Sequence, residues 1–223
     1  MSKIRNKYKY LAIAILIGGK STRFGSDKGI FEYHGKPLIS YQLETLGKKK
    51  YDIFLVAKSK AQVNNYLEKI ILRNIMAFII DDNNIISDLT IHTPLIGLYS
   101  AFKELNNLGY EKSFILSCDL PLIKLDVIEF LIKNSFEYDC CIPKWNNGFL
   151  EPLFTIYPVK KALIKAEKNV KKNIYKLTNL LDENWKINYI SIESLIQPLD
   201  KNLNSFININ EPSDLEKLTN LKI

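Results

Sequence analysis

The sequence predicts a three-layer α/β/α fold around a mostly parallel, doubly wound sheet. Short apolar runs rich in β-branched residues alternate with segments of helical periodicity from the first strand onward, which is typical of parallel sheets covered by helices on both faces. With 223 residues, of which 47% are hydrophobic, the chain suits one globular domain and is short for two. We therefore expect a single Rossmann-like domain over residues 1–223.

The first half of the chain shows this alternation clearly. An apolar run over 11–17 predicts a strand buried on both faces, and 30–33 reads as a short extended segment. Pro37 and Gly47 mark the start and the end of a helix. Runs of β-branched residues, or apolar residues at helical spacing, predict the other elements: strands over 53–57, 77–80 and 113–117, and helices over 62–73, 94–105 and 125–132.

The regular alternation of strands and helices changes from Trp145 onward. The expected elements are a strand over 139–143, a turn over 145–148, a strand over 149–157, a helix from Val159, a helix over 174–181, a strand over 187–192 and a last amphipathic helix carrying Leu215, Leu218 and Leu221. No internal repeat and no low-complexity linker interrupts them.

The stretch Leu16–Lys28 has the features of a triphosphate site. It follows the first buried strand, turns through two glycines, and carries cationic side chains at Lys20, Arg23 and Lys28. Glycines let backbone N–H groups approach an anion closely, and the cations neutralise phosphate oxygens. A Walker A loop is excluded because its first glycine would fall on Ala14, inside the strand. On these residues alone, an ordinary turn with solvated lysines has about equal weight.

Acidic residues follow two further strands of the predicted sheet. Asp81 and Asp82 end the strand over 77–80, and Asp119 ends the next one, with a proline two residues later. The carboxyl ends of parallel strands share one edge of a sheet, where ligands of such sheets bind. A carboxylate there is suited to a metal ion, although capping of the next helix is the favoured role of Asp119 when it is considered alone.

Charge and cysteine content narrow the class of protein. The formal charge of +7 comes from lysines spread along the chain, without the dense basic block of a nucleic-acid-binding protein. Cys118, Cys140 and Cys141 have no disulfide or zinc-site spacing, which is typical of reduced thiols in a cytoplasmic protein. No stretch reaches the ~20 apolar residues of a membrane span. We therefore expect neither a nucleic-acid nor a membrane partner.

The glycine-rich stretch resembles the signature of the molybdenum cofactor guanylyltransferases. The shared pattern is Leu-x-Gly-Gly-x-Ser-x-Arg-Phe-Gly-x-Asp-Lys over 16–28, and Cys118–Pro121 matches the family's Asp-x-Pro segment. Residues 94–97, 151–154 and 208–212 resemble further family segments, so the likeness covers essentially the whole chain. It implies a fold like that of the nucleotide-diphospho-sugar transferases, with a nucleotide-binding part at about 10–125 and an acceptor-side part at about 126–223.

The resemblance implies Mg²⁺-dependent transfer of GMP from GTP to the terminal phosphate of molybdopterin, with release of pyrophosphate. Arg23 and Lys28 are the expected phosphate-neutralising residues, and Asp119 is the expected magnesium ligand. The implied nucleotide contacts are Leu16, Ile17, Gly18, Gly19, Ser21, Lys28, Asp82 (or Asp81), Pro94 and Leu95. The implied acceptor contacts are Glu151, Pro152, Leu153, Asn208 and Asn210.

The resemblance also implies transient contact with molybdoenzymes and with other proteins of cofactor biosynthesis. Two features depart from the family, since Thr93 replaces a glycine and no amide residue stands in register after the second strand, where the sequence runs through Lys58. Turn and helix-cap roles weigh as much as ligand binding for the asparagines at 208 and 210. The alternatives are a cytidylyltransferase for the same pterin, a sugar-phosphate nucleotidyltransferase, and a non-catalytic adaptor that delivers the cofactor.

Overall fold

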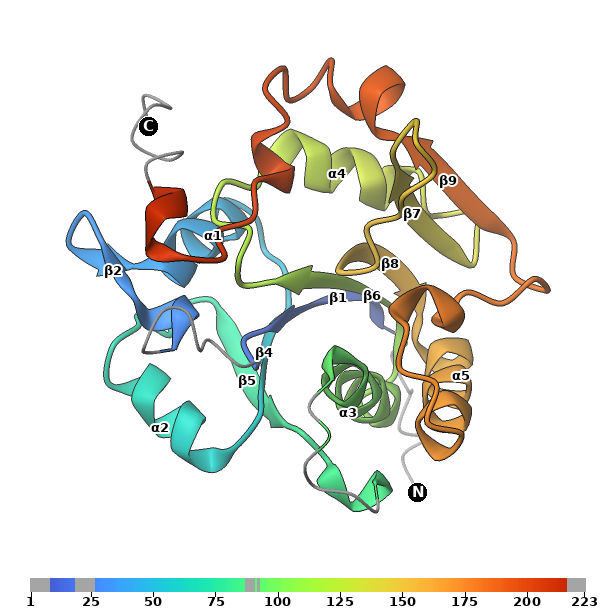
Figure 1. Cartoon of the computed structure of the whole chain (residues 1–223), viewed down its shortest axis with the longest axis horizontal. Helices are drawn as coiled ribbons and strands as arrows, with labels where there is room; N and C mark the ends of the chain where they lie inside the picture. The colour runs from blue at the N-terminus through green and yellow to red at the C-terminus, as the bar shows by residue number, and fades with distance from the viewer. Residues whose placement is uncertain (1–8, 19–26, 87–90, 92, 216–223) are drawn as a thin grey trace, which may run out of the picture.

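A seven-stranded sheet with the order β5-β4-β1-β6-β8-β7-β9 forms the centre of the fold (Figure 1). The structure, a computed structural model, describes residues 9–18, 27–86, 91 and 93–215. The strands of this sheet are β1 (Lys9–Leu16), β4 (Ile53–Ala57), β5 (Ile75–Ile80), β6 (Tyr110–Ser117), β7 (Cys140–Lys144), β8 (Phe154–Pro158) and β9 (Ile187–Ser191).

The predicted mostly parallel sheet is confirmed. Strands β5, β4, β1 and β6 pair in parallel, and β7 pairs in parallel with β9. Only β8 runs the other way among these seven strands, antiparallel to both β6 and β7. Because β1 is paired on both sides and covered on both faces, its run is apolar without alternation, as expected for a central strand.

Helices cover both faces of the sheet and complete the three layers. They are α1 (Leu38–Leu46), α2 (Lys60–Leu67), α3 (Pro94–Asn107), α4 (Leu125–Lys133) and α5 (Val159–Lys171). Helices α3 and α5 lie side by side on one face, whereas α1, α2 and α4 pack on the other (Figure 1). No helix in the described ranges combines the length and apolar character that crossing a bilayer requires.

Successive residues of β1 supply the two cores. Ile13 and Ile15 face the α1, α2 and α4 layer, and Ala12 and Ala14 face α3. All four are fully buried, and an isoleucine buried in this way contributes about 1.5–3 kcal/mol. The small alanines leave room for α3 beside the sheet. This packing fixes the start of α3 near the ends of β1 and β5.

The segment before α1, which the sequence predicts to be extended over 30–33, forms a short hairpin. A 3-10 turn, η2 (Lys28–Ile30), precedes the paired strands β2 (Glu32–Tyr33) and β3 (Lys36–Pro37). The turn between them places His34 and Gly35 at φ of 46° and 76°, which suits a tight hairpin turn. Helix α1 then begins after Pro37 and ends at Gly47, whose N–H donates to Leu43 O at 2.8 Å, as the sequence predicts.

Three predicted elements differ from the observed ones. The strand expected over 149–157 begins only at Phe154, because the preceding turn carries Gly148 at φ 90° and holds Trp145 against Phe149 by backbone hydrogen bonds. Helix α2 stops at Leu67, and Ile71, expected on its apolar stripe, is 84% exposed.

The helix expected over 174–181 is a single 3-10 turn, η4 (Leu177–Leu180). The other short turns are η3 (Asn83–Ile85), a π-helical turn η5 (Ile192–Ile196), η6 (Asn204–Phe206) and η7 (Pro212–Leu215). The remainder of the last predicted helix, with Leu218 and Leu221, lies outside the described residues.

Candidate active site

The carboxyl ends of four adjacent parallel strands share one edge of the sheet. At this edge β1 leads into Ile17, β4 into Lys58, β5 into Asp81, and β6 through Cys118 into Asp119. The chain adds strands on one side of β1 as far as β5 and then crosses to the other side with β6. The boundary between β1 and β6 is therefore the switch point at which open α/β sheets bind their ligands.

Three side chains from distant parts of the chain meet beyond the end of β6. Lys28 Nζ lies 3.5 Å from Asp119 Oδ2 and donates a 3.1 Å hydrogen bond to Asn210 Oδ1. The Ile209 N–H donates to the Asp119 carbonyl at 2.9 Å, which holds the segment that carries Asn210 beside this strand end. The side chains of Lys28 and Asp119 are only 14% and 22% exposed, so solvent and salt screen this pair less than an open surface pair.

The residues around Asp119 fit a divalent cation. Its Oδ1 is buried and accepts no hydrogen bond from any described residue, which is costly for an ionised carboxylate. Mg²⁺ prefers carboxylate and amide oxygens, and such oxygens are present on Asp119 and Asn210. No cluster of three or more His, Cys, Asp or Glu occurs in the described part of the chain. A bound Mg²⁺ would therefore take most of its ligands from water and from substrate phosphates, as it commonly does.

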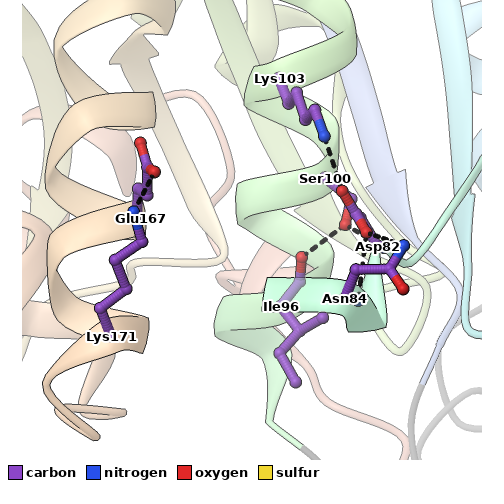
Figure 2. Close-up of polar contacts among 7 residues, drawn as sticks. All are labelled: Asp82, Asn84, Ile96, Ser100, Lys103, Glu167 and Lys171. Carbon is purple, nitrogen blue, oxygen red and sulfur yellow. Dashed lines mark hydrogen bonds and ion pairs between the residues drawn. The ribbon is translucent and has the colours of Figure 1, made fainter. Parts of the chain in front are cut away.

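The second acidic residue after β5 is engaged in structural contacts. Asp82 pairs with Lys103 of α3 at 2.6 Å, and its N–H donates to Ser100 Oγ at 2.8 Å (Figure 2). Its Oδ1 accepts hydrogen bonds from the backbone and side chain of Asn84 in η3. These contacts, with the Lys103 hydrogen bond as the main cause, hold the pKa of Asp82 below its ordinary value. Asp82 thus ties the end of β5 to α3.

Asp81 has different surroundings and faces the start of α3. A Cβ added at Gly97 would lie 3.4 Å from Asp81 Oδ1 and 3.5 Å from Leu16 Cδ2, so these three residues are neighbours. Burial alone raises the pKa of Asp81 to about 6, with no hydrogen bond or cation of the described residues to lower it. The sequence put Asp82 first as the base contact, with Asp81 as the alternative. Among the described residues, Asp82 has a cationic partner and Asp81 has none.

Glu151 lies on the other side of Asp119. Trp145 Nε1 donates to Glu151 Oε1 at 2.7 Å within the turn that joins β7 to β8. Burial raises the pKa of Glu151, the Trp145 hydrogen bond opposes that rise, and the charge of Asp119 adds to it. The charges of the two carboxylates therefore influence each other, and burial is the main cause of the raised pKa of Glu151.

Several predicted nucleotide contacts can act only through their backbone. Leu16, Ile17 and Leu95 are buried in the core, with side chains at most 6% exposed. Thr93 caps α3 by accepting a hydrogen bond from the Leu95 N–H at 3.3 Å, so this departure from the family's glycine supplies a helix cap. A Cβ on Gly18 would lie 3.4 Å from the backbone nitrogen of Lys58, so the first glycine fits tightly against the end of β4.

The remaining predicted residues are not brought to Asp119 by any observed contact. The Pro152 carbonyl accepts from the Tyr157 hydroxyl at 3.0 Å, and Leu153 packs into the core under α3 and α5, so both have structural roles. Pro94 and Asn208 are exposed. Three predicted residues lie outside the described ranges: Gly19, Ser21 and Arg23.

Residues behind the site were missed by the sequence analysis. Asp27 accepts hydrogen bonds from the Gly29 N–H at 3.2 Å, from the Tyr66 hydroxyl at 2.8 Å and from the Gln62 side-chain amide. A second glutamine, Gln42, is fully buried and donates to the backbone near Asp119. A signal was present, because Gln42 occupies a position four residues from both Leu38 and Leu46, on the apolar face of α1.

Gly29→Ala should destabilise the protein by about 1–3 kcal/mol through overpacking. An added Cβ would lie 2.0 Å from the Tyr66 hydroxyl oxygen, and the Tyr66 side chain is fully buried and unable to retreat into solvent. Urea unfolding measures the change. The double variant Gly29→Ala with Tyr66→Phe removes the clashing oxygen and should recover part of the loss. Equal stability of Gly29→Ala and wild type would contradict this packing.

A family model described as a MobA-like NTP transferase domain matches residues 13–184 of the chain. A Pyrococcus horikoshii protein named "Probable molybdenum cofactor guanylyltransferase" is 34% identical over 94% of this chain and 99% of its own length. An Aquifex aeolicus protein with the same name is 29% identical over 98% of this chain and 92% of its own length.

Solved structures show the same architecture. The crystal structure of molybdopterin-guanine dinucleotide biosynthesis protein A from Archaeoglobus fulgidus has a TM-score of 0.72 and 26% identity, covering 92% of this chain and 95% of that one. A 4-diphosphocytidyl-2C-methyl-D-erythritol synthase from Anaerococcus prevotii has a TM-score of 0.63 at 15% identity, with 94% of each chain covered. The latter likeness shows the fold alone, and together the two confirm the predicted fold class.

Proposed function

The chain belongs to the family of MobA-like NTP transferase domains and is a nucleotidyltransferase, and from this premise we propose that it transfers GMP from GTP to molybdopterin. A phosphate oxygen of the acceptor forms a bond to the α-phosphorus of GTP, and the bond from that phosphorus to the α,β-bridging oxygen breaks. The electron pair leaves with pyrophosphate. The observation that carries the proposal is the meeting of Lys28, Asp119 and Asn210 at the switch point of the sheet.

Transfer of this kind depends on positioning and charge neutralisation more than on covalent chemistry. The acceptor phosphate has a second pKa of ~6 and is mostly dianionic at neutral pH, so it attacks without a general base. Lys28 supports this role because Asp119 and Asn210 already hold its ammonium group at the place where the phosphates bind. Arg23 is the second proposed cation, on the strength of the sequence resemblance alone.

Asp119 Oδ1 and Asn210 Oδ1 are the oxygens that would hold Mg²⁺ in this proposal. The ion, when bound, supplies positive charge to the phosphate oxygens of the nucleotide. The buried Oδ1 of Asp119, which lacks a partner among the described residues, supports the assignment. Glu151, next to Asp119, marks the acceptor side, and its carboxylate is oriented by Trp145.

Asp81 is the proposed contact to guanine. An ionised carboxylate can accept hydrogen bonds from both the ring N–H and the amino group of guanine, an arrangement that cytosine does not offer. The half-buried position of Asp81 beside Gly97 and Leu16 supports this, since a charged hydrogen bond is stronger away from water.

Asp81→Asn should weaken GTP binding by roughly 10- to 100-fold, because a neutral amide presents one acceptor and an unwanted donor to guanine. The same change should raise the thermal stability of the free protein at pH 7 and above. The sign follows from the pKa of about 6, above the ordinary 3.8, because the folded wild type loses stability as pH rises through this window. At pH 4 the stability difference should vanish.

The control for this prediction is Asp82→Asn, which breaks the Lys103 pair and leaves the Asp81 carboxylate in place. Thermal unfolding at pH 4 and pH 7.5, with and without GTP, measures both effects. If Asp82→Asn lost GTP binding and Asp81→Asn kept it, the base contact would belong to Asp82.

The test of the proposed function is pyrophosphate release by the purified protein with GTP, Mg²⁺ and molybdopterin. Protection against thermal unfolding by GTP and by CTP separates the guanylyl enzyme from a cytidylyl relative. Release with CTP and not with GTP would overturn the proposal in favour of the cytidylyltransferase. Binding of GTP with no release under any acceptor would favour an adaptor that delivers the cofactor.

The division into a nucleotide part at about 10–125 and an acceptor part at about 126–223 accompanies this proposal. Strand β8 supports such a division, because it pairs with β6, the last strand of the nucleotide part, and runs antiparallel to it. Transient contact with molybdoenzymes and a cytoplasmic location stay predictions from the sequence.

A further inference from the structure

Gln62 connects the two ends of the glycine-rich segment. Its side-chain Nε2 donates to the Ile17 carbonyl at 2.8 Å, near the start of the stretch Leu16–Lys28, and to Asp27 Oδ2, near its end. Its Oε1 accepts a 2.8 Å hydrogen bond from the Lys58 N–H at the end of β4. The side chain is only 3% exposed, and Ser59 caps the helix that carries it by accepting from the Gln62 N–H.

Gln42 makes the corresponding connection around Asp119. Its Nε2 donates to the Ser117 carbonyl at 2.7 Å and to the Leu120 carbonyl at 2.8 Å, so the two bonds span Cys118 and Asp119. Gln42 is fully buried in α1. Its Oε1 accepts no hydrogen bond from the described residues, so the side chain contributes through its two N–H donors.

The chemistry of the primary amide explains why glutamine stands at both places. One –NH₂ group carries two protons that diverge in a plane, so it can bridge two acceptors that neither a hydroxyl nor a backbone N–H could reach together. Each acceptor lies where water is largely excluded, and a buried carbonyl or carboxylate without a donor is unfavourable. Both glutamines belong to helices on the same face of the sheet, Gln42 to α1 and Gln62 to α2 (Figure 1).

Gln62 is linked to Lys28 through the neighbouring residue Asp27. Asp27 accepts from Gln62, from the Tyr66 hydroxyl and from the Gly29 N–H, so its carboxylate is fixed on three sides. The next residue is Lys28, whose ammonium lies 3.5 Å from Asp119 Oδ2. Gln62 thus fixes the chain position from which Lys28 reaches the site, and Gln42 fixes the position of Asp119.

We propose that Gln62 and Gln42 are positioning residues that hold Lys28 and Asp119 in register for nucleotidyl transfer. Neither glutamine is placed in contact with substrate, and each acts through a backbone segment. The two roles differ: Gln62 holds the segment that carries Lys28, the proposed phosphate contact, and Gln42 holds Asp119, the proposed metal ligand. The kinetic part of this proposal rests on the proposed function, whereas the clamping of the two segments does not.

The experiment compares Gln62→Met and Gln42→Met, which keep the length and volume of the side chain and remove its donors. A displacement of ~1 Å at a reacting group can cost about 10²-fold in rate. We therefore expect Gln62→Met to lower kcat/KM for GTP roughly 10- to 100-fold with a smaller change in the Mg²⁺ requirement. Gln42→Met should raise the Mg²⁺ concentration for half-maximal rate and lower kcat, with a smaller change in KM for GTP.

Amide hydrogen exchange by NMR tests the clamps without any substrate. Gln62→Met should speed exchange at the Lys58 and Gly29 amides, and Gln42→Met should speed it at the Ile209 amide, which donates to Asp119. Gln62→Glu is the second variant, because it keeps the acceptor for Lys58 and loses both donors. It should reproduce the GTP defect of Gln62→Met while protecting the Lys58 amide.

Asn169→Leu is the control for general loss of a buried amide. Asn169 is 4% exposed and its Nδ2 donates to the Asn179 carbonyl at 3.0 Å, in the α5 region away from Asp119. It should lower stability and change neither kcat/KM for GTP nor the Mg²⁺ requirement. The proposal would be overturned if both glutamine variants lost only stability, as expected for Asn169→Leu. It would also be overturned if each variant changed the GTP kinetics and the Mg²⁺ requirement to the same extent.

Failure of the proposed function has a different outcome. If the wild-type protein released no pyrophosphate from GTP, the proposed reaction would be wrong. Faster exchange at Lys58 and Gly29 in Gln62→Met alone, and at Ile209 in Gln42→Met alone, would still establish the two clamps. Unchanged exchange at all three amides in both variants would overturn the clamps even in an active guanylyltransferase.

Discussion

Lys28→Ala should lower the rate of nucleotidyl transfer by about 10²- to 10³-fold, as expected for the loss of one charge-stabilising group. Negative charge grows on the phosphate oxygens during the reaction, and the Lys28 ammonium is held close to that position by Asp119 and Asn210. The effect should fall on kcat/KM, because the interaction strengthens in the transition state. Pyrophosphate release under saturating and limiting GTP measures it.

Lys36→Ala is the matched control for this charge. Lys36 is also a partly buried ammonium in an ion pair, with Glu44 at 2.6 Å, but it lies on the hairpin before α1 and has no contact with Asp119. Its loss should leave kcat/KM within about twofold, since a partly exposed pair contributes about 0–1 kcal/mol. If Lys28→Ala kept more than half of the wild-type rate, the lysine would have no role in charge neutralisation.

The sheet could be predicted because its signal is local. β1, β4 and β6 are paired on both sides and each contains a continuous apolar run, and alternation with helices then implies parallel pairing. The segment after β7 could not be predicted as well. Gly148, in the left-handed region, turns the chain so that Leu150 forms only an isolated bridge with Lys144 and continuous pairing resumes at Phe154, a break that the apolar pattern over 149–157 does not show.

The candidate site also contains residues that could be predicted from the sequence and residues that could not. Lys28 and Asp119 were indicated by the family resemblance of the segments that carry them, since on the residues alone a solvated lysine and a helix-capping aspartate had equal or greater weight. The choice between Asp81 and Asp82 depended on the side chain of Lys103, which lies 21 residues from Asp82 along the chain. Only the packing of α3 against β5 shows which carboxylate already has a cationic partner. The positioning glutamines were missed for a related reason, since a polar residue on an apolar helix face reveals neither of its acceptors.

Asp119→Asn should lower the rate by about 10²- to 10³-fold and raise the Mg²⁺ concentration needed for half-maximal activity. Asparagine keeps the shape of the side chain and removes the charge that would hold the cation and that lies opposite Lys28. The free protein should lose little stability, because removing the charge from a buried carboxylate whose Oδ1 lacks a partner among the described residues offsets the loss of the Lys28 ion pair. Rates across a Mg²⁺ titration and thermal unfolding without ligands measure the two effects.

The two measurements together separate a metal ligand from a structural aspartate. A structural role requires that the asparagine variant unfold at lower temperature, and the proposed role requires the Mg²⁺ titration to shift while the unfolding temperature stays level or rises. Asp126→Asn, an exposed charge in the first turn of α4, controls for net charge and should shift neither. If Asp119→Asn needed the same Mg²⁺ concentration as the wild type, the buried Oδ1 would have a structural role only. The cation would then need another ligand.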